Sequence, residues 1–353
     1  MKKIYFSVLI CLINLNIACS KKPVGDDPPT GSANTGNTPA APVSYAGLLV
    51  ALTNNTSKKI EIYDPMSTDW NLSDAKKWSW GPTVNLGFSA DENSKFGGGT
   101  DFKPRKMPIW QNADYAAISD NSFAAIIEYP SGVRKWSKII SGNLHSAELL
   151  PNGNIALAAS DGNWIRVYAS SQGPDNNTYA EYTLLAAHAV LWDPDLSVLW
   201  VTGQDPSTNA HILTALAIGG TDARPELTEV VACRKTLPTA WGHEIGAYYG
   251  NKNLLWVTSN GGEYVFNKTT KSFSTAPTNG LTFVKGIINQ PSGQIVLVRP
   301  DANKNPRPAI GCTLNDWSTS TIDFYAANGQ WQGARVVNGA CFYKLKLVND
   351  SYQ

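Results

Sequence analysis

The stretch HSAELLPNGNIALAAS, residues 145–160, contains a histidine, a short apolar run, a turn built from Pro, Asn and Gly, and a second apolar run. Two apolar runs around such a turn predict a β-hairpin. Comparable stretches begin at five other basic residues along the chain, which are Arg105, His188, His243, Lys285 and Lys344. Third and fourth strand-like runs follow most of these hairpins. Four strands per unit, repeated every 40 to 59 residues, are typical of propeller blades.

The final copy begins at Lys344 and reaches the end of the chain without three partner strands. The N-terminal part of the body supplies three such runs, AGLLVALT (46–53), KKIEIYDP (58–65) and KKWSWGP (76–82). We therefore expect an all-β fold, a six-bladed β-propeller over residues 45–353. Its C-terminal strand would complete the N-terminal blade, and this closure leaves no long free sheet edge.

The amino-acid composition indicates which class of protein this is and which classes of partner its charge does not favour. The chain has 353 residues, of which 42% are hydrophobic and 16% charged, and it contains 12 Trp, 14 Tyr and 29 Gly. This balance predicts a globular, turn-rich β protein rather than a disordered one. The formal net charge is +1, so no bulk attraction to nucleic acid or to an acidic membrane is expected. We expect a monomer.

The N-terminus predicts export. Two lysines precede an apolar run from Ile4 to Ile17, which is too short to span a bilayer and is typical of a secretory signal over residues 1–18. The following NIAC resembles a lipoprotein signal, with Cys19 as the lipidated residue, although Asn16 replaces the usual aliphatic residue. Residues 19–44 form a tether rich in Pro, Gly, Ser, Thr and Asn. The body would be anchored to the outer membrane, on its surface or periplasmic face, by the lipid alone.

Three cysteines remain in the body after the signal and Cys19 are set aside, namely Cys233, Cys312 and Cys341. An odd number in an exported protein predicts one disulfide and one free thiol. Cys312 lies in a long loop and Cys341 just before an innermost strand, so both are expected at the same end of the propeller. We expect the Cys312–Cys341 disulfide, which leaves Cys233 free.

The residues at which the six hairpins begin are all basic, and we call them the frame residues: Arg105, His145, His188, His243, Lys285 and Lys344. In a propeller the innermost strands start around one mouth of the central channel, so equivalent residues there face a common centre. The simpler alternative is that each residue only caps its own loop or extends into water.

A shared centre would suit an anion or a metal. The cations Arg105, Lys285 and Lys344 predict binding of a uronate carboxylate, a sulfate or a phosphate. The three imidazoles of His145, His188 and His243 are candidate catalytic bases if they stay neutral. They are equally candidate ligands of a divalent transition metal. Glu148 and Glu244 lie close enough in sequence to orient an imidazole, and the alternative is that strand alternation directs them into a neighbouring blade.

Long loops and aromatic residues should surround the same mouth. The loops 83–104 and 301–319 are the longest in the body, and long loops commonly wall binding clefts. Trp241, Trp317 and Tyr343 are candidate ligand-binding residues because their rings could offer flat faces to a sugar.

The motifs HSAELLPNGN, AHAVLWDP, GHE and NQPSGQIV, with EIYDP near the N-terminus and the closing SYQ, resemble an uncharacterised six-bladed propeller family. Its members are secreted proteins and lipoproteins of Bacteroidota and other glycan-degrading bacteria. The resemblance covers residues 45–353 and implies fold and export, but no activity. A looser similarity, without a shared motif, is to oligogalacturonate lyase, a propeller whose histidines hold a metal beside a uronate.

Three functions remain open. The first is an enzyme acting on an acidic glycan, such as a metal-assisted uronate lyase, which needs charge neutralisation together with a base and an acid. The second is a non-catalytic protein that recognises the same glycan. The third is a protein-interaction scaffold.

Overall fold

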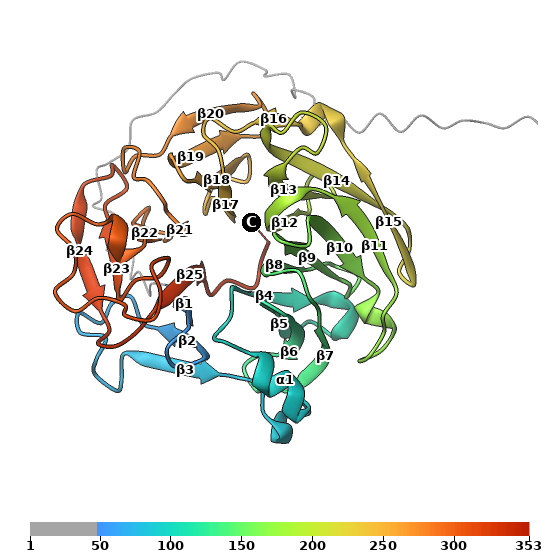
Figure 1. The fold of residues 1–353 in the computed structure, drawn as a ribbon, viewed down its shortest axis with the longest axis horizontal. Helices are drawn as coiled ribbons and strands as arrows, with labels where there is room; N and C mark the ends of the chain where they lie inside the picture. The colour runs from blue at the N-terminus through green and yellow to red at the C-terminus, as the bar shows by residue number, and fades with distance from the viewer. Residues whose placement is uncertain (1–47, 353) are drawn as a thin grey trace, which may run out of the picture.

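Six small antiparallel sheets surround a central channel, which confirms the six-bladed β-propeller (Figure 1). The structure is a computed structural model that describes residues 48–352. The expected signal, the lipidation site Cys19 and the tether lie outside the described residues. Within residues 48–352, no helix is long and apolar enough to cross a membrane.

Each blade has four strands from the channel outward, and they follow chain order except in the first blade, where the C-terminal strand β25 is innermost. The innermost strands are β25 (Phe342–Leu347), β4 (Asp101–Met107), β8 (Leu144–Leu149), β12 (Leu185–Asp193), β17 (Gly242–Ala247) and β21 (Gly286–Asn289). The second strands are β1 (Val50–Asn54), β5 (Ala113–Asp120), β9 (Ile155–Ala159), β13 (Val198–Gln204), β18 (Leu254–Ser259) and β22 (Ile295–Val298).

The two outer layers follow the same order. The third strands are β2 (Lys59–Tyr63), β6 (Phe123–Glu128), β10 (Trp164–Tyr168), β14 (His211–Thr221), β19 (Gly262–Asn267) and β23 (Thr321–Tyr325). The outermost are β3 (Lys76–Trp80), β7 (Arg134–Ile139), β11 (Tyr179–Thr183), β15 (Arg224–Glu229), β20 (Ser272–Thr275) and β24 (Trp331–Val336), with a short β16 (Lys235–Thr236) beside β14. The one α-helix among the described residues is α1 (Ala90–Lys95).

The ring closes through the C-terminal strand, as the sequence predicts. β25 pairs antiparallel with β1, and Leu345 lies opposite Leu52. All five residues of β1 are buried, because this strand lies between β25 and β2 and carries neighbouring blades on both faces. The first and last parts of the chain therefore form one sheet, and unfolding either part exposes the core of the first blade.

Apolar side chains from adjacent blades form the core between the sheets. Strand residues alternate between the two faces of a sheet, so each blade buries one set of side chains against the preceding blade and the other against the following one. Trp136, Trp200 and Trp256 are fully buried in such layers. With both faces covered, the only surfaces left for a ligand site are the two ends of the channel and the outer rims.

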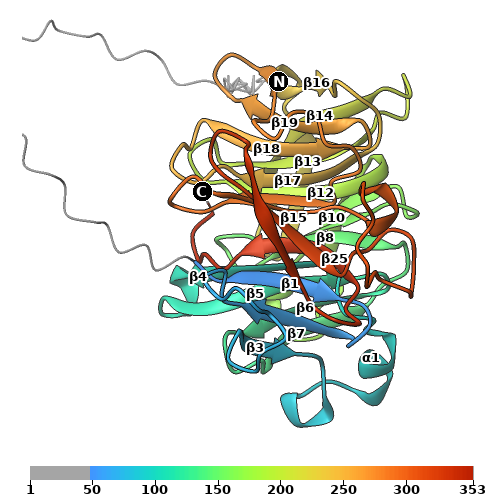
Figure 2. The same ribbon diagram turned by 90° about the vertical axis from the view of Figure 1, so that its left-hand side faces the viewer.

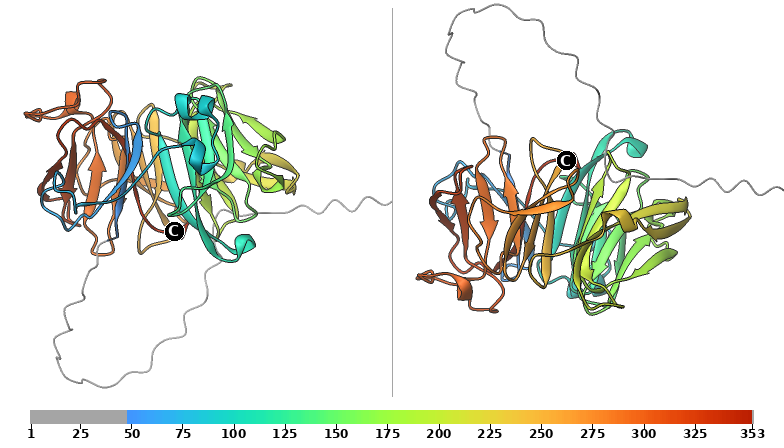
Figure 3. Two further views of the ribbon diagram at one scale, coloured as in Figure 1. Left: turned by 90° about the horizontal axis from the view of Figure 1, so that it is seen from below. Right: turned by 90° about the horizontal axis from the view of Figure 1, so that it is seen from above.

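The two ends of the channel carry different chain segments. α1 lies on one face of the ring, and the C-terminal segment lies on the opposite face, over the channel (Figures 2 and 3). The innermost strands start on the α1 face, because the loop that contains α1 leads into the start of β4. We call the channel end on the α1 face the strand-start mouth and the other end the tail mouth.

Cys312 and Cys341 form a disulfide, with their Cα atoms 4.9 Å apart. It ties the loop 301–319 to the residue that precedes β25. Cys233 is fully buried in the core between the fourth and fifth blades. Its sulfur atom also takes part in a disulfide. The expectation that Cys233 is a free thiol is therefore wrong.

Replacing both Cys312 and Cys341 by serine is expected to lower the free energy of unfolding by about 3 kcal/mol. The disulfide closes a loop of 29 residues, and loss of such a cross-link increases the conformational freedom of the unfolded chain. Urea unfolding of the double variant, beside the wild type with and without reductant, measures the effect. An unchanged midpoint would mean that β-sheet pairing alone holds the loop.

Candidate functional site

The strand-start mouth brings four of the six frame residues together. The rings of His145 and His188 stack with centroids 4.0 Å apart, and the ring of His243 meets that of His188 edge-on at 5.4 Å. The Lys285 Nζ atom lies 2.9 Å from Nε2 of His243. These residues come from four consecutive blades. Their side chains therefore meet at the channel because the blades form a ring, and no single hairpin brings them together.

A repeated backbone feature positions these four side chains. The residue two places before each of them has a left-handed conformation: Asn143 (φ 56°), Ala186 (φ 48°), Trp241 (φ 63°) and Phe283 (φ 61°). Residues other than glycine adopt this region at an energetic cost, and strained residues of this kind cluster at functional sites. The bend turns each connection inward at the start of the innermost strand.

Each imidazole is held by a different partner. Nδ1 of His145 lies 2.9 Å from the hydroxyl of Tyr343. Nδ1 of His188 lies 3.0 Å from the carbonyl oxygen of Ala186, so it carries the proton and leaves Nε2 as an acceptor. Nε2 of His243 lies 2.6 Å from Oδ1 of Asn260, to which it can donate, and 2.9 Å from Nζ of Lys285, from which it can accept. A neutral ring makes one of these two hydrogen bonds at a time, depending on its tautomer.

Burial keeps all three imidazoles neutral. Burial, with smaller contributions from the Lys344 and Lys285 ammonium groups, lowers the pKa of His188 to about 4. Burial also holds the pKa of His145 and of His243 well below the ordinary value, with neighbouring histidines and lysines adding to the effect. At neutral pH these rings can therefore accept a proton or a hydrogen bond.

The protein is expected to lose stability as the pH falls from 7 to 5. A histidine whose pKa is lower in the folded state than in the unfolded state favours folding fully above about pH 6.5, where both states are neutral. This contribution is lost as the pH falls toward the folded pKa, which is about 4 for His188, at up to about 1.4 kcal/mol per pH unit for each ring.

Thermal unfolding followed between pH 7 and pH 5 measures this loss. A His188→Gln variant should show a shallower fall, because one of the three titrating rings is gone. An identical slope in variant and wild type would show that His188 does not titrate in this window.

A pocket of about 630 Å³ opens above these rings. His145, His188, Lys285 and Tyr343 line its floor. Its walls come from loops distant in the sequence, and the wall residues are Asn55, Lys58, Lys95, Gly97, Thr100, Asp120, Asn121, Asn143, Leu314, Asn315 and Trp317. We call this space the mouth pocket. Both loops expected from their length, 83–104 and 301–319, contribute to it.

The oxygens of the single carboxylate on the pocket wall are occupied by backbone amides. Asp120 accepts hydrogen bonds from the amides of Gly97, Gly98, Gly99 and Asn121, and its burial raises its pKa. Gly98 has a φ of 116°, and a Cβ there would lie 2.3 Å from a backbone oxygen, so only glycine fits this turn. Apart from this carboxylate, whose oxygens are occupied, the pocket presents cations and neutral polar groups to a ligand.

Lys344 lies beneath the mouth pocket rather than in it. Its Nζ donates to the backbone oxygens of His145 (3.2 Å) and His243 (3.0 Å) and pairs with Glu244 at 3.4 Å. These bonds direct the ammonium into the channel, where the side chain is fully buried. A direct contact between Lys344 and a ligand, as its place among the frame residues suggests, does not fit this geometry.

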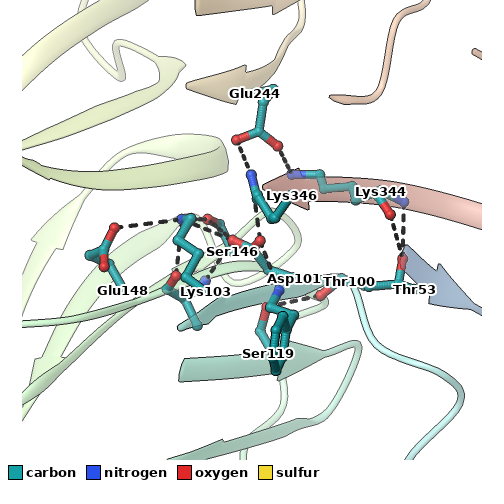
Figure 4. A network of polar contacts seen from close by, with 12 residues as sticks. Thr53, Thr100, Asp101, Lys103, Ser119, Ser146, Glu148, Glu244, Lys344 and Lys346 are labelled. Carbon is teal, nitrogen blue, oxygen red and sulfur yellow. Dashed lines mark hydrogen bonds and ion pairs between the residues drawn. The ribbon is translucent and has the colours of Figure 1, made fainter. Parts of the chain in front are cut away.

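A buried chain of ion pairs fills the channel below Lys344 (Figure 4). We call it the channel network, and its members alternate in charge: Lys344, Glu244, Lys346, Asp101, Lys103, Glu148 and Arg105. Glu148 and Glu244 belong to this network and bond to no imidazole. Of the two alternatives for Glu148 and Glu244, the structure therefore shows the one in which strand alternation directs them away from the imidazoles, Glu148 toward a neighbouring blade and Glu244 toward β25 of the first blade.

Arg105 lies at the tail mouth and not among the histidines. Its guanidinium pairs with Glu148 at 2.9 Å, and its carbon Cζ lies 4.8 Å from the ring centroid of Tyr352 in the C-terminal segment. The sequence alignment failed here because β4 begins at Asp101, four residues earlier than the repeat suggests. Thr100, directly before β4, lines the mouth pocket in place of Arg105.

The two candidate tryptophans behave differently. The indole of Trp317 is 57% exposed and lines the mouth pocket. Trp241 is 48% exposed, but its ring packs against His211, with centroids 4.8 Å apart, and it does not line the pocket. Tyr343 lines the pocket through the hydroxyl that meets His145.

The three histidines do not fit a metal site. Residues 48–352 contain no group of three or more His, Cys, Asp or Glu side chains arranged to hold a metal ion. The His145 and His188 rings are stacked face to face, and the Lys285 ammonium occupies Nε2 of His243. A dication would also meet the charges of Lys285 and Lys344, so the arrangement favours an anion.

Reasoning from sequence missed the amide side chains of the pocket wall and the channel network. The amides come from loop residues with no repeated pattern. The channel network could have been predicted, because charged residues occupy every second position of two innermost strands. These residues are Asp101, Lys103 and Arg105 in β4 and Lys344 and Lys346 in β25. Charged residues at every second position share one face of a strand.

A family model described as a family of unknown function, DUF6528, matches residues 49–305. The chain belongs to the DUF6528 family. The matched part contains His145, His188, His243 and Lys285, whereas Trp317 and Tyr343 lie beyond it. This finding confirms the part of the expected resemblance that concerns an uncharacterised family.

One solved structure supports the fold of this DUF6528 protein and no more. A protein of unknown function from Bacteroides caccae is 10% identical, with a TM-score of 0.54, over 85% of this chain and 98% of that one. A chain of the mitotic checkpoint complex is also 10% identical, with a TM-score of 0.48, over 92% of each chain. No curated protein matches this DUF6528 sequence.

Proposed function

We propose that the mouth pocket binds an anionic carbohydrate, and that the protein serves in glycan recognition. The observation that carries the proposal is the composition of this pocket. It combines a buried lysine and the two neutral imidazoles of His145 and His188 on the floor with amides and an exposed indole on the walls. The amides can bind sugar hydroxyls, the indole can pack against the face of a sugar ring, and the lysine can pair with an acid group.

The charge of the pocket supports an anionic ligand. Lys285 is on the floor, while Lys58 and Lys95 are exposed on the wall. The only carboxylate facing them, Asp120, is saturated by backbone amides. The channel network beneath adds four cations against three anions, with Lys344 nearest to the histidines. A carboxylate or sulfate in the pocket would therefore be attracted by charge and bound by several donors.

The neutral polar groups support a sugar rather than an inorganic anion. The side-chain amides of Asn55, Asn121, Asn143 and Asn315 line the wall, and each can both donate to and accept from a hydroxyl. Trp317 offers an exposed indole at the rim, a position at which aromatic rings contribute large contact area at little entropic cost.

The same groups could support breakdown of the ligand. Elimination from a uronate requires a base near the acidic carbon-bound proton and donors at the carboxylate. His145 and His188 are neutral at pH 7 and reach the pocket. Recognition requires only the donors, and it is the function that the geometry supports best.

Replacing Trp317 by alanine tests the proposal. Calorimetric titration with acidic oligosaccharides, such as oligogalacturonate and sulfated oligosaccharides, should show binding to the wild type and at least tenfold weaker binding to the variant, because stacking on an aromatic ring is lost. Trp331→Ala is the matched control, since Trp331 is 61% exposed on β24 and lies outside the mouth pocket.

Equal affinities for acidic and neutral sugars would contradict an anion site. No binding to any carbohydrate, with the variants folded, would leave the protein-interaction scaffold as the better reading of the fold.

The proposal includes export and a lipid anchor at the outer membrane, which would place the pocket where glycans are encountered. The support lies in the basic start, the apolar run and the NIAC motif around Cys19. Metabolic labelling with a fatty acid should mark the wild type and leave a Cys19→Ala variant unlabelled. Labelling of both chains would contradict lipidation at Cys19.

A further inference from the structure

We propose that Lys285 is a reactive amine that forms an imine with the carbonyl group of a 2-oxo acid in the mouth pocket. The inference rests on the proposed function in one respect, since it uses the same pocket and the same preference for an acid group. It goes further by assigning covalent chemistry to one side chain and by naming the class of compound with which that side chain reacts.

Lys285 differs from the other buried lysines in its surroundings. Its exposed fraction is 9%, and its Nζ bonds to Nε2 of His243, with no carboxylate oxygen within 4.0 Å of Nζ among the described residues. Five further lysines are equally or more buried, and each has an acidic partner: Lys103, Lys268, Lys304, Lys344 and Lys346. An amine buried without a counter-charge is the arrangement that favours its neutral, nucleophilic form.

No group bonded to Lys285 carries a compensating negative charge. Lys344 on β25 is the nearest other cation, and His243, His188 and His145 on β17, β12 and β8 are neutral. The nearest acid of the channel network, Glu244, is already paired with Lys344 and Lys346. Burial, with a smaller contribution from Lys344, lowers the pKa of Lys285 to about 8.

This shift places a large share of the amine in its reactive form. At pH 7.5, a group with a pKa of about 8 is roughly one quarter deprotonated. An ordinary lysine, with a pKa of about 10.4, is deprotonated in about one molecule in a thousand at the same pH. The remaining ammonium form still attracts an anion into the pocket before the reaction.

His243 is placed to move the proton that imine formation requires. Its Nε2 lies 2.9 Å from Nζ of Lys285, and Asn260 holds the same edge of the ring at 2.6 Å. Its Nδ1 is buried and has no partner among the described residues. In the tautomer that carries its proton on Nδ1, the neutral ring can accept a proton from the attacking amine through Nε2 and return it to the carbonyl oxygen of the bound compound.

The reaction balances without any further reactant. The lone pair of the Lys285 amine attacks the carbonyl carbon, a C–N bond forms, and the carbonyl electron pair moves to oxygen. One amine proton passes through His243 to that oxygen and gives a carbinolamine. Loss of the hydroxyl group with a second proton, as water, leaves the C=N bond, and protonation gives the cationic iminium form.

The rest of the pocket selects a carbonyl compound that carries an acid group. The Lys58 and Lys95 ammonium groups on the wall, together with the field of Lys344 below, attract a carboxylate. In a 2-oxo acid the carboxylate is bonded directly to the carbonyl carbon, so one small compound can meet both the amine and the cations.

Reductive trapping on the intact wild-type body tests the reactivity directly. The protein is incubated at pH 7.5 with glyoxylate, the smallest 2-oxo acid, and cyanoborohydride, and modified lysines are located by peptide mass spectrometry. Lys285 should be modified about tenfold or more faster than Lys252, a lysine whose side chain is 60% exposed. The rate should rise with pH to a midpoint near 8.

Acetaldehyde serves as a matched probe without an acid group. The preference for Lys285 over Lys252 should be at least threefold greater with glyoxylate than with acetaldehyde. Modification of Lys285 no faster than that of Lys252, or a midpoint near 10, would overturn the proposal. An equal preference with both aldehydes would overturn the assignment to 2-oxo acids.

Protection by oligogalacturonate separates this inference from the proposed function. Fast modification of Lys285 that acidic oligosaccharides do not slow would support the reactive amine and contradict the carbohydrate site. Binding of the oligosaccharide without selective modification of Lys285 would support the site and overturn the reactive amine. A Lys285→Arg variant, with a cation that does not form an imine, should bind the oligosaccharide but show no trapped product at this position.

Discussion

Replacing Lys285 by methionine is expected to weaken the binding of acidic oligosaccharides about a hundredfold while making the protein more stable. Hydrogen bonds to a charged group contribute about 1.5 to 3 kcal/mol each, and a hundredfold change corresponds to about 2.7 kcal/mol. The methionine keeps the apolar stem of the side chain but removes the charge that the pocket offers to an anion.

The gain in stability follows from the surroundings of the amine. Lys285 is buried with no carboxylate beside it, and its pKa falls from the ordinary 10.5 to about 8. A lysine whose pKa is lower in the folded state destabilises the fold below pH 8, and this cost disappears as the pH rises from 8 to 10.5. Removing the charge should therefore raise the free energy of unfolding by about 1 to 3 kcal/mol at neutral pH.

Calorimetric binding and thermal unfolding of the same preparation measure both effects. Lys252→Met is the control, because Lys252 is exposed and lies outside the mouth pocket. A Lys285→Met variant that loses stability would indicate a structural role for the ammonium. Unchanged affinity would remove Lys285 from the binding site. Weaker binding with greater stability is the pattern expected of a residue that serves function at the expense of the fold.

Replacing Asp101 by asparagine is expected to lower the free energy of unfolding by about 3 to 5 kcal/mol, the range for breaking a buried ion pair on one side. Asp101 is fully buried and lies 2.9 Å from Lys103 and 3.5 Å from Lys346. It also accepts hydrogen bonds from the Ser146 hydroxyl and the Ala147 amide. The substitution keeps the shape but leaves two buried ammonium groups with less counter-charge.

Acid should reproduce part of this effect in the wild type. The Lys103 and Lys346 ammonium groups outweigh the effect of burial and hold the pKa of Asp101 well below its ordinary value. A carboxylate of this kind stabilises the fold fully above its unfolded pKa of about 3.9, and the contribution is lost as the pH falls below that value. This loss begins below the range in which the histidines titrate.

Chemical unfolding at pH 7 measures the effect of the substitution. The control is Asp114→Asn, since Asp114 forms an exposed pair with Lys106 at 3.2 Å, and such pairs contribute about 1 kcal/mol or less. Similar losses in the two variants would mean that water reaches the channel network and screens its charges.

The fold could be predicted from local sequence patterns, namely strand alternation and turn residues. The hairpin at His145 and its repeats could be recognised because strand alternation and turn residues are set within about sixteen positions. The closure by β25 could also be predicted, because the first blade had three strand-like runs and the last copy had one. The convergence of His145, His188, His243 and Lys285 followed from the same repeat.

The predictions for Arg105 and Trp241 were wrong because the spacing of residues along the chain did not indicate where these side chains lie. β4 begins four residues earlier than the repeat suggests, so Arg105 lies at the tail mouth. Trp241 and Trp317 look equivalent in sequence, yet Trp241 packs against His211 and Trp317 lines the mouth pocket. Which face a loop tryptophan meets depends on loops from other blades, and these are brought together only when the ring closes.

The sequence by itself determined the propeller, the number of blades, the strand that closes the ring and four basic residues at one mouth, because periodicity along the chain is a local property. Tertiary structure alone decided the protonation and the partners of those residues. The imidazoles are neutral because neighbouring blades bury them. Lys344 is neutralised by Glu244, which comes from β17, whereas Lys285 meets only a histidine. Burial and counter-charge depend on which side chains the closed ring brings within a few ångströms, and spacing along one chain does not specify that.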